Sequence, residues 1–406
     1  MHDTGDCGEL DMITHTTIET EAARLADEVI ALRRDFHRHP ELGLEEMRTS
    51  SLISRYLLDL GLEVKTGIGG TGVIGLLKGS RPGKTVMLRA DMDALPIQEL
   101  NEVDYRSVNP GVMHACGHDG HMAVLLGTAK LLSRMRHSLS GRVKFVFQPA
   151  EENLGGARLM IEQGVLQDPQ VDAAFGLHLI SLLPTGYIGC REGAFMASID
   201  IFTIRVFGRA GHSALPVGSV DAISLSAEVV LNLQNHIKGI LPEDCPIVVN
   251  IGTFHGGTAP NIVTDRVELT GTVRALDEGV RSSIKGLMDE FLRKTVIDNS
   301  GTYELEYAQG YPVTVNDEAM TAFVRRIAAD IVDSSHVIDM PPAMASEDMS
   351  FYLKEVPGCF FFVGAGGTDP VTAQTHHNPH FFIDEQALDL GVRMMASIAA
   401  DFLNTA

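Results

Sequence analysis

Long apolar runs, a paired set of cysteines and an excess of positive charge are all missing from this 406-residue sequence. No stretch approaches the roughly 20 uncharged apolar residues that a membrane-spanning helix needs, so a membrane protein is not expected. The five cysteines are odd in number and widely scattered, which argues against a disulfide framework and favours a reducing compartment. Residues 1–12 are polar and acidic, unlike the basic start and apolar middle of a secretory signal. Together these absences predict a cytoplasmic protein.

The charge balance excludes further classes of protein. With 32 Lys and Arg against 53 Asp and Glu, the formal net charge is −21. Such a surface repels phosphate backbones and acidic lipid headgroups, so we expect neither a nucleic acid nor a membrane as partner. What is present is a globular composition, 45% hydrophobic and 21% charged, in a chain long enough for two domains.

Strands and helices alternate in the first half of the chain and again near its end. Apolar residues recur at steps of four and three from about residue 16 to 38, which predicts a helix that Pro40 terminates. Buried strands are predicted at Val73–Leu77, Thr85–Arg89, Val143–Gln148, Ala173–His178 and Cys359–Gly364, with further helices at Gly120–Met135 and Asp384–Leu403. This alternation predicts an α/β domain, residues 1–196 and 312–406, with a mostly parallel sheet flanked by helices.

Residues 197–311 follow a different order of elements. Strand-like and helical patterns succeed one another at Ile199–Phe207, Val220–Ile237, Ile247–Phe254, Val267–Arg274, Val280–Val296 and Tyr303–Tyr307. This βαββαβ order is that of ferredoxin-like domains, which can form a compact unit by themselves. We therefore expect a small ferredoxin-like domain inserted into the larger one.

The densest group of potential metal ligands lies at residues 114–121, His-Ala-Cys-Gly-His-Asp-Gly-His, just before a predicted helix. Cys, His and Asp bind borderline divalent metals, and Cys116 and His118 can face one ion in a turn. A buried thiol beside surface histidines is the alternative, and for a lone Cys-x-His pair it would be preferred. Three histidines, a cysteine and an aspartate within eight residues favour a metal site.

Metal-type side chains also follow other predicted strands. Glu151 and Glu152 come directly after one strand, and adjacent carboxylates diverge, so one could bind a metal while the other transfers protons. Taken alone, this pair would be interpreted as an exposed acidic turn. Similar positions at strand ends are held by Asp91, Asp93, His178, His376 and His377. Because open α/β sheets place their sites at the carboxyl ends of strands, we predict a common site with enough ligands for two ions.

Glycines at residues 67–72 match the G-x-G-x-x-G pattern of dinucleotide-binding folds, with Asp91 about twenty residues further on. That fingerprint requires a helix directly after the glycines, whereas Val73–Leu77 has a strand composition. We interpret the segment as a strand–turn–strand with a glycine corner, and we reject nucleotide binding.

Four segments in combination resemble the metallopeptidase family of aminoacylases, hippurate hydrolases and plant indole-acetyl-amino-acid hydrolases: Arg89–Pro96, His114–His121, Gln148–Glu152 and His377–Pro379. The resemblance implies two divalent metal ions, manganese or zinc with cobalt or nickel also compatible, whose ligands are Cys116, His118, Glu152, His178 and His377. Glu151 would be the general base, and Cys116 would bridge the ions. Asp93, with Asp91 beside it, would orient a ligand, a role that metal sites commonly require.

The inserted domain resembles the family's lid and dimerisation domain, which implies a homodimer formed through it. His212 matches the residue that reaches the substrate carbonyl, often from the neighbouring subunit, and Asn261 and Arg274 match lid positions near the substrate. Two departures from relatives concern the acyl or amino-acid pocket: Val217 follows Pro216, and Met349 follows Glu347-Asp348.

These features predict an N-acyl-amino-acid amidohydrolase of the hippurate or N-acetyl-amino-acid type. Water activated between the metal ions would lose a proton to Glu151, and a metal and His212 would hold the resulting oxyanion. Alternatives on the same site are a dipeptidase, a deacetylase of a biosynthetic N-acetyl amino acid, and a hydrolase of an aryl amide or amine. A non-catalytic metal-binding protein is disfavoured, because it would need Glu152 but no free base beside it.

Overall fold

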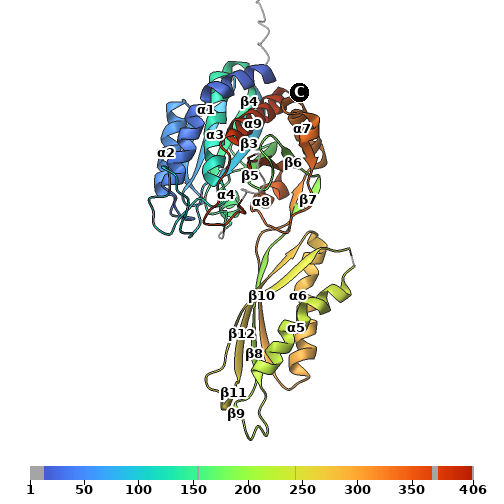
Figure 1. Ribbon diagram of the computed structural model, residues 1–406. Coiled ribbons are helices and arrows are strands. Elements are labelled where there is room, and N and C mark those ends of the chain that lie inside the picture. Colours follow the sequence, from blue (N-terminus) through green and yellow to red (C-terminus); the bar gives the residue numbers. More distant parts are fainter. Residues whose placement is uncertain (1–12, 153–154, 243, 368–373, 405–406) are drawn as a thin grey trace, which may run out of the picture. The chain divides into compact units, whose positions relative to one another are not determined.

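The computed structural model describes residues 13–152, 155–242, 244–367 and 374–404 (Figure 1). The chain divides into two compact units. The first takes in the chain up to residue 193, residues 316–340 and the chain from residue 351 onward, and the second takes in residues 194–315 and 341–350. The segment expected as an inserted domain, residues 197–311, lies within the second unit. No helix in the described ranges is long and apolar enough to cross a membrane.

An eight-stranded sheet forms the centre of the first unit. Its strands lie side by side in the order β1 (Glu63–Ile68), β2 (Gly72–Lys78), β4 (Ser140–Gln148), β3 (Arg81–Asp91), β5 (Ala173–Ile180), β16 (Gly358–Gly364), β6 (Ile188–Cys190) and β15 (Val337–Asp339). β4, β3, β5 and β16 are parallel, and β1, β2 and β6 add antiparallel pairings. The predicted α/β class is confirmed, and every strand predicted for this sheet forms.

Helices α1 (His15–Arg38), α3 (His118–Arg134) and α9 (Gln386–Asn404) pack against one another, and α3 and α9 also pack against the sheet (Figure 1). α1 begins where the Thr14 hydroxyl accepts a hydrogen bond from the Thr17 N–H, and it buries the apolar stripe that predicted it. α3 is buried along most of its length, because α1, α9 and the sheet surround it. The sequence patterns did not predict the remaining helices, α2 (Met47–Asp59), α4 (Gly156–Glu162), α7 (Glu318–Ile331) and α8 (Met349–Glu355).

The second unit has the predicted ferredoxin-like arrangement. Its elements follow in the order β8 (Asp200–Phe207), α5 (Ala222–Ile240), β10 (Ile247–Gly256), β12 (Arg266–Ala275), α6 (Glu278–Leu292) and β13 (Thr302–Gln309). The strands form one antiparallel sheet in the order β10-β12-β8-β13, and α5 and α6 pack on it around a separate apolar core. Two short strands, β9 (Gly211–His212) and β11 (Ile262–Val263), pair antiparallel as a ribbon. Along the chain, β9 follows β8 and β11 precedes β12.

The glycine-rich segment between β1 and β2 forms a tight corner. β1 and β2 pair antiparallel, and Gly67, Gly69 and Gly70 have positive φ angles that favour glycine. A Cβ atom on Gly72 would lie 2.3 Å from the Ile68 carbonyl oxygen, so only glycine fits there. A strand rather than a helix follows, which confirms the strand–turn–strand prediction.

Candidate metal centre and active site

The loop that enters α3 presents Cys116 and His118 at the carboxyl ends of the parallel strands. Gly117 between them has a φ of 94°, a left-handed conformation that lets the chain turn sharply into the helix. The His118 Nδ1–H donates to the Asp93 carbonyl at 2.9 Å, so Nε2 carries the lone pair. Among the described residues, that buried Nε2 atom has no hydrogen-bond partner, and Glu152 Oε1 lies 3.9 Å away. His118 is therefore oriented as a ligand would be.

His178 is oriented in the same way from β5. Its Nδ1–H donates to the Leu179 carbonyl at 3.0 Å, which leaves the Nε2 lone pair facing the Cys116 sulfur at 3.5 Å. His376 Nδ1 lies 3.6 Å from the same sulfur, and His376 Nε2 accepts the Ser181 N–H at 3.4 Å. The sequence singled out His376 as a strand-end residue but assigned it no role, because only the folded structure shows its contact with Cys116.

Glu151 and Glu152 follow β4 in a turn that one side chain clamps. The Glu151 N–H donates to Asp93 Oδ1 and the Glu152 N–H donates to Asp93 Oδ2, each at 3.0 Å. Ala150, just before them, has a φ of 54°, which is uncommon for a residue other than glycine. Asp93 thus fixes the backbone of both glutamates while its own carbonyl orients His118. One aspartate links the two segments that carry most of the candidate ligands.

His377 completes the group from the chain after β16. Its Nε2 lies 3.2 Å from Glu152 Oε1, and its N–H donates to the Ala115 carbonyl at 2.8 Å. With a φ of 62°, its backbone is left-handed, a strained conformation that is common where a side chain must be aimed at a site. The five predicted ligands therefore come together from four separate segments of the first unit.

The donor set suits divalent cations. Ligand atoms of Cys116, His118 and His178 lie within 4.8 Å of one another, and so do those of Cys116, Glu152 and His377. Burial, with the nearby carboxylates of Glu152 and Glu151, raises the pKa of the Cys116 thiol well above its ordinary value. A thiolate here needs a positive charge, and soft or borderline metals supply one. Two donor groups that share Cys116, one of them with the unpartnered His118 nitrogen, fit two ions.

His121 is held by the protein rather than free to bind metal. Its Nδ1–H donates to Asp91 at 2.6 Å, and its Nε2 accepts the Leu179 N–H at 2.9 Å, so both ring nitrogens are used. The Arg89 guanidinium donates to the other oxygen of Asp91 at 2.7 Å. Although burial opposes it, the charges of His118 and Arg89 lower the pKa of Asp91 well below its ordinary range. Of the His114–His121 cluster, Cys116 and His118 are the residues that we assign to the candidate centre.

The two most buried ligand imidazoles, His118 and His178, differ in the direction of their pKa shifts. Burial and then His121 lower the pKa of His178 well below its ordinary value, so this ring is a neutral donor. Burial also acts to lower the pKa of His118, but Asp91 and Asp93 raise it to about 10. A bound cation replaces the proton that these carboxylates otherwise attract.

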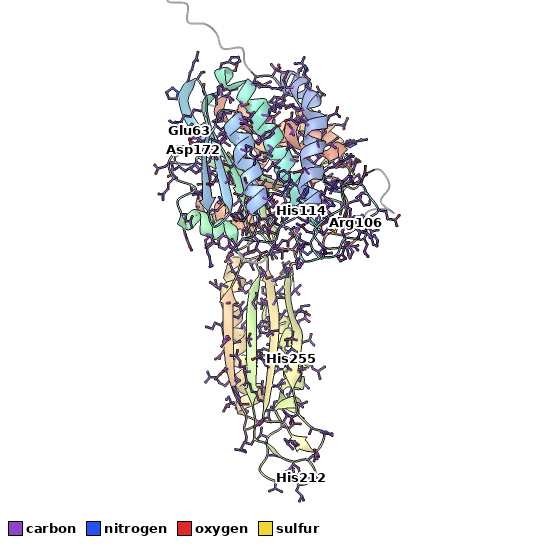
Figure 2. All side chains as sticks on the ribbon, turned by 90° about the vertical axis from the view of Figure 1, so that its left-hand side faces the viewer. Glu63, Arg106, His114, Asp172, His212 and His255 are labelled. Carbon is purple, nitrogen blue, oxygen red and sulfur yellow. The ribbon has the colours of Figure 1, made fainter. Side chains whose placement is uncertain are left out.

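In the second unit, the predicted lid residues occupy the two ends of the sheet. His212 is exposed in β9, next to Asn261, whose carbonyl accepts the Ser213 N–H at 3.2 Å (Figure 2). Arg274 lies at the other end of β12, where it donates to the Met344 carbonyl at 3.1 Å and to Ser346 Oγ at 2.8 Å. β12 begins at Arg266, a few residues after the ribbon strand that pairs with His212. From Arg266 to Arg274 the strand rises about 3.4 Å per residue, so His212 and Arg274 of one chain are about 27 Å apart.

The other residues singled out in this unit differ in exposure. Glu347 is buried, and its carboxylate accepts the Met349 N–H at 3.0 Å, which fixes the start of α8. Met349 is fully buried, whereas Val217 is 96% exposed on the loop after His212. Val217 is therefore available for contact, and Met349 acts through packing.

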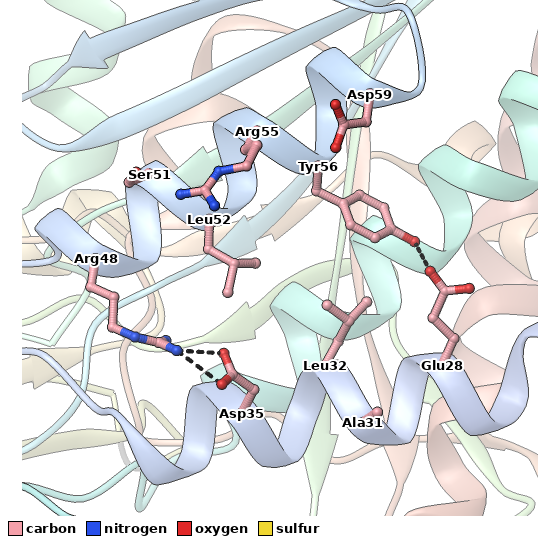
Figure 3. A pocket seen from close by; sticks show the side chains of 10 residues that line it. All are labelled: Glu28, Ala31, Leu32, Asp35, Arg48, Ser51, Leu52, Arg55, Tyr56 and Asp59. Atoms are coloured by element: carbon pink, nitrogen blue, oxygen red, sulfur yellow. Dashed lines mark hydrogen bonds and ion pairs between the residues drawn. The ribbon is translucent and has the colours of Figure 1, made fainter.

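A pocket of about 560 Å³ between α1 and α2 lies apart from these residues (Figure 3). Four of its polar side chains pair with one another: Arg48 donates to both oxygens of Asp35 at 2.9 Å, and the Tyr56 hydroxyl donates to Glu28 at 2.8 Å. The pocket is lined by no His or Cys among the described residues, so we do not assign the hydrolytic site to it.

Comparisons with known proteins identify the family to which the chain belongs. The family model of peptidase family M20/M25/M40 matches residues 87–401. The chain is 40% identical to thermostable carboxypeptidase 2 of Saccharolobus solfataricus, over 95% of this chain and 98% of that protein. It is 42% identical to an N-acyl-L-amino acid amidohydrolase of Geobacillus stearothermophilus, over 73% of this chain and 81% of that protein.

A solved structure extends the agreement to the fold. The YXEP protein of Bacillus subtilis, described as a dinuclear metal-binding peptidase of the M20 family, is 34% identical and matches with a TM-score of 0.83. The match covers 95% of this chain and 100% of that one. Since the family model covers most of the chain and both relatives exceed 30% identity over more than two thirds of it, this chain is a hydrolase that belongs to peptidase family M20/M25/M40.

Proposed function

We propose that the protein hydrolyses the amide bond of N-acyl amino acids of the hippurate or N-acetyl-amino-acid type. The observation that carries the proposal is the clamp of Asp93 on the adjacent N–H groups of Glu151 and Glu152. Glu152 lies among the donor atoms of Cys116 and His377, and Glu151 is a second buried carboxylate beside it, with an oxygen within 4.8 Å of ligand atoms of His118 and Glu152. A protein that only bound metal would need the first carboxylate and not the second.

Glu151 would act as the general base. Two divalent cations, manganese or zinc with cobalt or nickel also compatible, supply a water of lowered pKa and positive charge near the substrate carbonyl. The residues that would hold them are Cys116, His118, Glu152, His178 and His377. Glu151 accepts the proton of the attacking water and delivers it to the leaving nitrogen, which converts a poor leaving group into an amine.

Arg274 is a candidate receptor for the substrate carboxylate. Its guanidinium donates to two neutral oxygens, and no carboxylate of the described residues forms an ion pair with it. Burial lowers the pKa of its guanidinium. A half-buried cation without a counter-ion favours an anionic ligand, and a bidentate carboxylate suits the planar guanidinium.

His212 would donate a hydrogen bond to the substrate oxygen from a second copy of the chain. An acyl amino acid is too short to span the distance of about 27 Å between His212 and Arg274 of one chain. A homodimer through the second unit removes this conflict. Supporting it, β10 is an edge strand of its sheet, Leu231 on α5 is 72% exposed, and Phe254 on β10 is 41% exposed. Leu231→Glu should convert the dimer to a monomer in light-scattering measurements.

The decisive experiment uses Glu151→Gln. We expect this variant to keep both metal ions and its thermal stability but to lose about 10²–10⁴-fold in kcat, since proton transfer is removed. Metal content, circular dichroism and hydrolysis of hippurate and N-acetyl amino acids measure these outcomes. Glu102→Gln, an exposed change in the same unit, is the control for a lost carboxylate. Retained turnover in Glu151→Gln would remove Glu151 from its role.

A carboxypeptidase or dipeptidase is the second candidate, favoured by the 40% identity to thermostable carboxypeptidase 2. A panel of hippurate, N-acetyl amino acids, indole-acetyl amino acids and free dipeptides separates the two, using chelated protein before and after addition of manganese or zinc. Preference for acyl groups without a free amine supports the amidohydrolase. Preference for dipeptides supports the peptidase. No hydrolysis with two metal ions bound would redirect the search to aryl amides and other C–N bonds.

A further inference from the structure

The loop between α1 and α2 carries two buried or half-buried glutamates that face different ways. Glu41 accepts the Arg48 N–H at 3.0 Å and the Thr49 N–H at 2.8 Å, and so satisfies the first turn of α2. Glu46 is the N-cap residue of α2, yet its side chain makes no capping hydrogen bond. Because Glu41 performs the capping, the carboxyl of Glu46 serves another purpose.

Glu46 is directed toward the turn that holds the general base. Its Oε1 accepts the Ala150 N–H at 3.0 Å, and its Oε2 accepts the Thr71 hydroxyl at 2.5 Å. The side chain is fully buried, and no basic side chain of the described residues forms an ion pair with it. Burying a carboxyl without a cation is costly, so its retention needs a reason other than stability.

Glu46 and Asp93 together bind three consecutive backbone N–H groups. Glu46 takes that of Ala150, and Asp93 takes those of Glu151 and Glu152. Ala150 is left-handed, and such a backbone persists only where its surroundings hold it. A Cβ atom on Gly43 would lie 3.1 Å from the Ala150 Cα, so the loop that carries Glu46 packs directly on this residue.

The glycine corner joins the same arrangement. Thr71 lies between Gly70 and Gly72, and its hydroxyl bridges the corner to Glu46. A Cβ atom on Gly72 would lie 3.0 Å from the Pro149 ring, so the glycine corner also packs against the turn that carries Glu151 and Glu152. A segment that resembles a nucleotide-binding motif thus supports the glutamate turn instead.

We propose that Glu46 is a positioning residue for the reaction: with Thr71, it holds Ala150 left-handed and thereby aims the carboxylate of Glu151. This inference rests on the proposed function, in which Glu151 is the base. Glu46 touches neither the candidate ligands nor the substrate groups discussed above, so its effect passes through the Ala150 amide. Its removal should therefore change the rate of the chemical step more than the binding of substrate or metal.

The test compares Glu46→Ala and Glu46→Gln in the metal-loaded protein. Glu46→Ala leaves the Ala150 N–H without its acceptor, and we expect kcat to fall about 10–100-fold while KM changes less than about twofold and two metal ions stay bound. Glu46→Gln should restore most of kcat, because the amide oxygen can accept the Ala150 N–H and the amide nitrogen can donate to Thr71. Glu45→Ala, an exposed change one residue away, is the control.

Thr71→Val serves if Glu46→Ala does not fold. It removes only the hydroxyl that orients Glu46 and should lower kcat by a smaller factor at unchanged KM. Wild-type kcat in both Glu46→Ala and Thr71→Val would overturn the inference, as would equal losses in Glu46→Ala and Glu46→Gln that follow metal loss. Glu151→Gln, assayed in parallel, separates the two proposals. If it is active, the proposed base is wrong; if it is inactive while Glu46→Ala is not, only the positioning role fails.

Discussion

The candidate metal centre of the first unit and the ribbon end of the second unit differ in how their side chains are held. At the candidate metal centre, two ligand imidazoles are fixed by a second contact: His118 by the Asp93 carbonyl, and His178 by the Leu179 carbonyl. At the ribbon end, His212 and its neighbours are exposed, and each strand of the ribbon has two residues. The first region has ligand groups held in place by hydrogen bonds, whereas the histidine of the second is exposed on a short ribbon.

After Glu151→Gln, the largest effect is expected from the ribbon end, although its histidine is exposed. His212→Ala should lower kcat about 10²–10³-fold, the usual loss when one oxyanion donor is removed. Stability should be unchanged, because the side chain is exposed. Steady-state kinetics and thermal melting measure both. His137→Ala, at an exposed histidine of the first unit, should behave as wild type.

Mixing two inactive variants sharpens the same comparison. If His212 acts across the dimer, a mixed dimer of His212→Ala and Glu151→Gln contains one complete site. Random reassembly should then restore about a quarter of wild-type activity, since half of the dimers are mixed and each has one working site. No recovery on mixing would show that His212 does not act across the dimer.

The difference between the two regions also explains what the sequence could and could not predict. Strand ends carrying Asp, Glu and His were visible as patterns, and the structure brings them together. The distinction between His118 and His121 was not visible, because it depends on which ring nitrogen bonds to which backbone group. β9 and β11 are too short for any periodic pattern. No pattern in the sequence singled out Glu46, since its partner Ala150 is far along the chain.

The next largest effect is on the free energy of unfolding; it comes from Glu46 and depends on pH. Burial raises the pKa of Glu46 from 4.5 to about 7; hydrogen bonds from Thr71 and Ala150 oppose the rise, and Asp93 adds to it. Because the native pKa is the higher one, the group stabilises the fold below about pH 4.5. This contribution of about 3 kcal/mol is lost as the pH rises to about 7.

Glu46→Gln should remove that pH dependence. The free energy of unfolding of the variant minus that of the wild type should therefore increase by about 3 kcal/mol between pH 4.5 and 7.5. Urea unfolding at equal metal concentration measures the difference at each pH. A difference that stays constant across this range would mean that Glu46 keeps its ordinary pKa in the fold.

A smaller effect is expected from Asp93→Asn, which changes the hydrogen bonding of this side chain but keeps its size. The amide nitrogen of Asn cannot accept an N–H, so one of the two bonds to Glu151 and Glu152 is lost. We expect metal affinity or kcat to fall about 10–100-fold, as for other side chains that orient ligands. Titration with cobalt and steady-state kinetics measure the two quantities. Asp104→Asn, an exposed change in the same unit, should alter neither.

The smallest effect returns to the ribbon end, at Val217. This side chain is 96% exposed, so Val217→Ser should change the free energy of unfolding by less than about 0.5 kcal/mol. If the loop after His212 contacts the acyl group, the ratio of kcat/KM for benzoyl over acetyl substrates should fall, by no more than about tenfold. Ile240→Ser, at the far end of α5, should leave that ratio unchanged. An unaltered ratio in Val217→Ser would confine this loop to presenting His212, and the choice of acyl group would then depend on buried residues such as Met349.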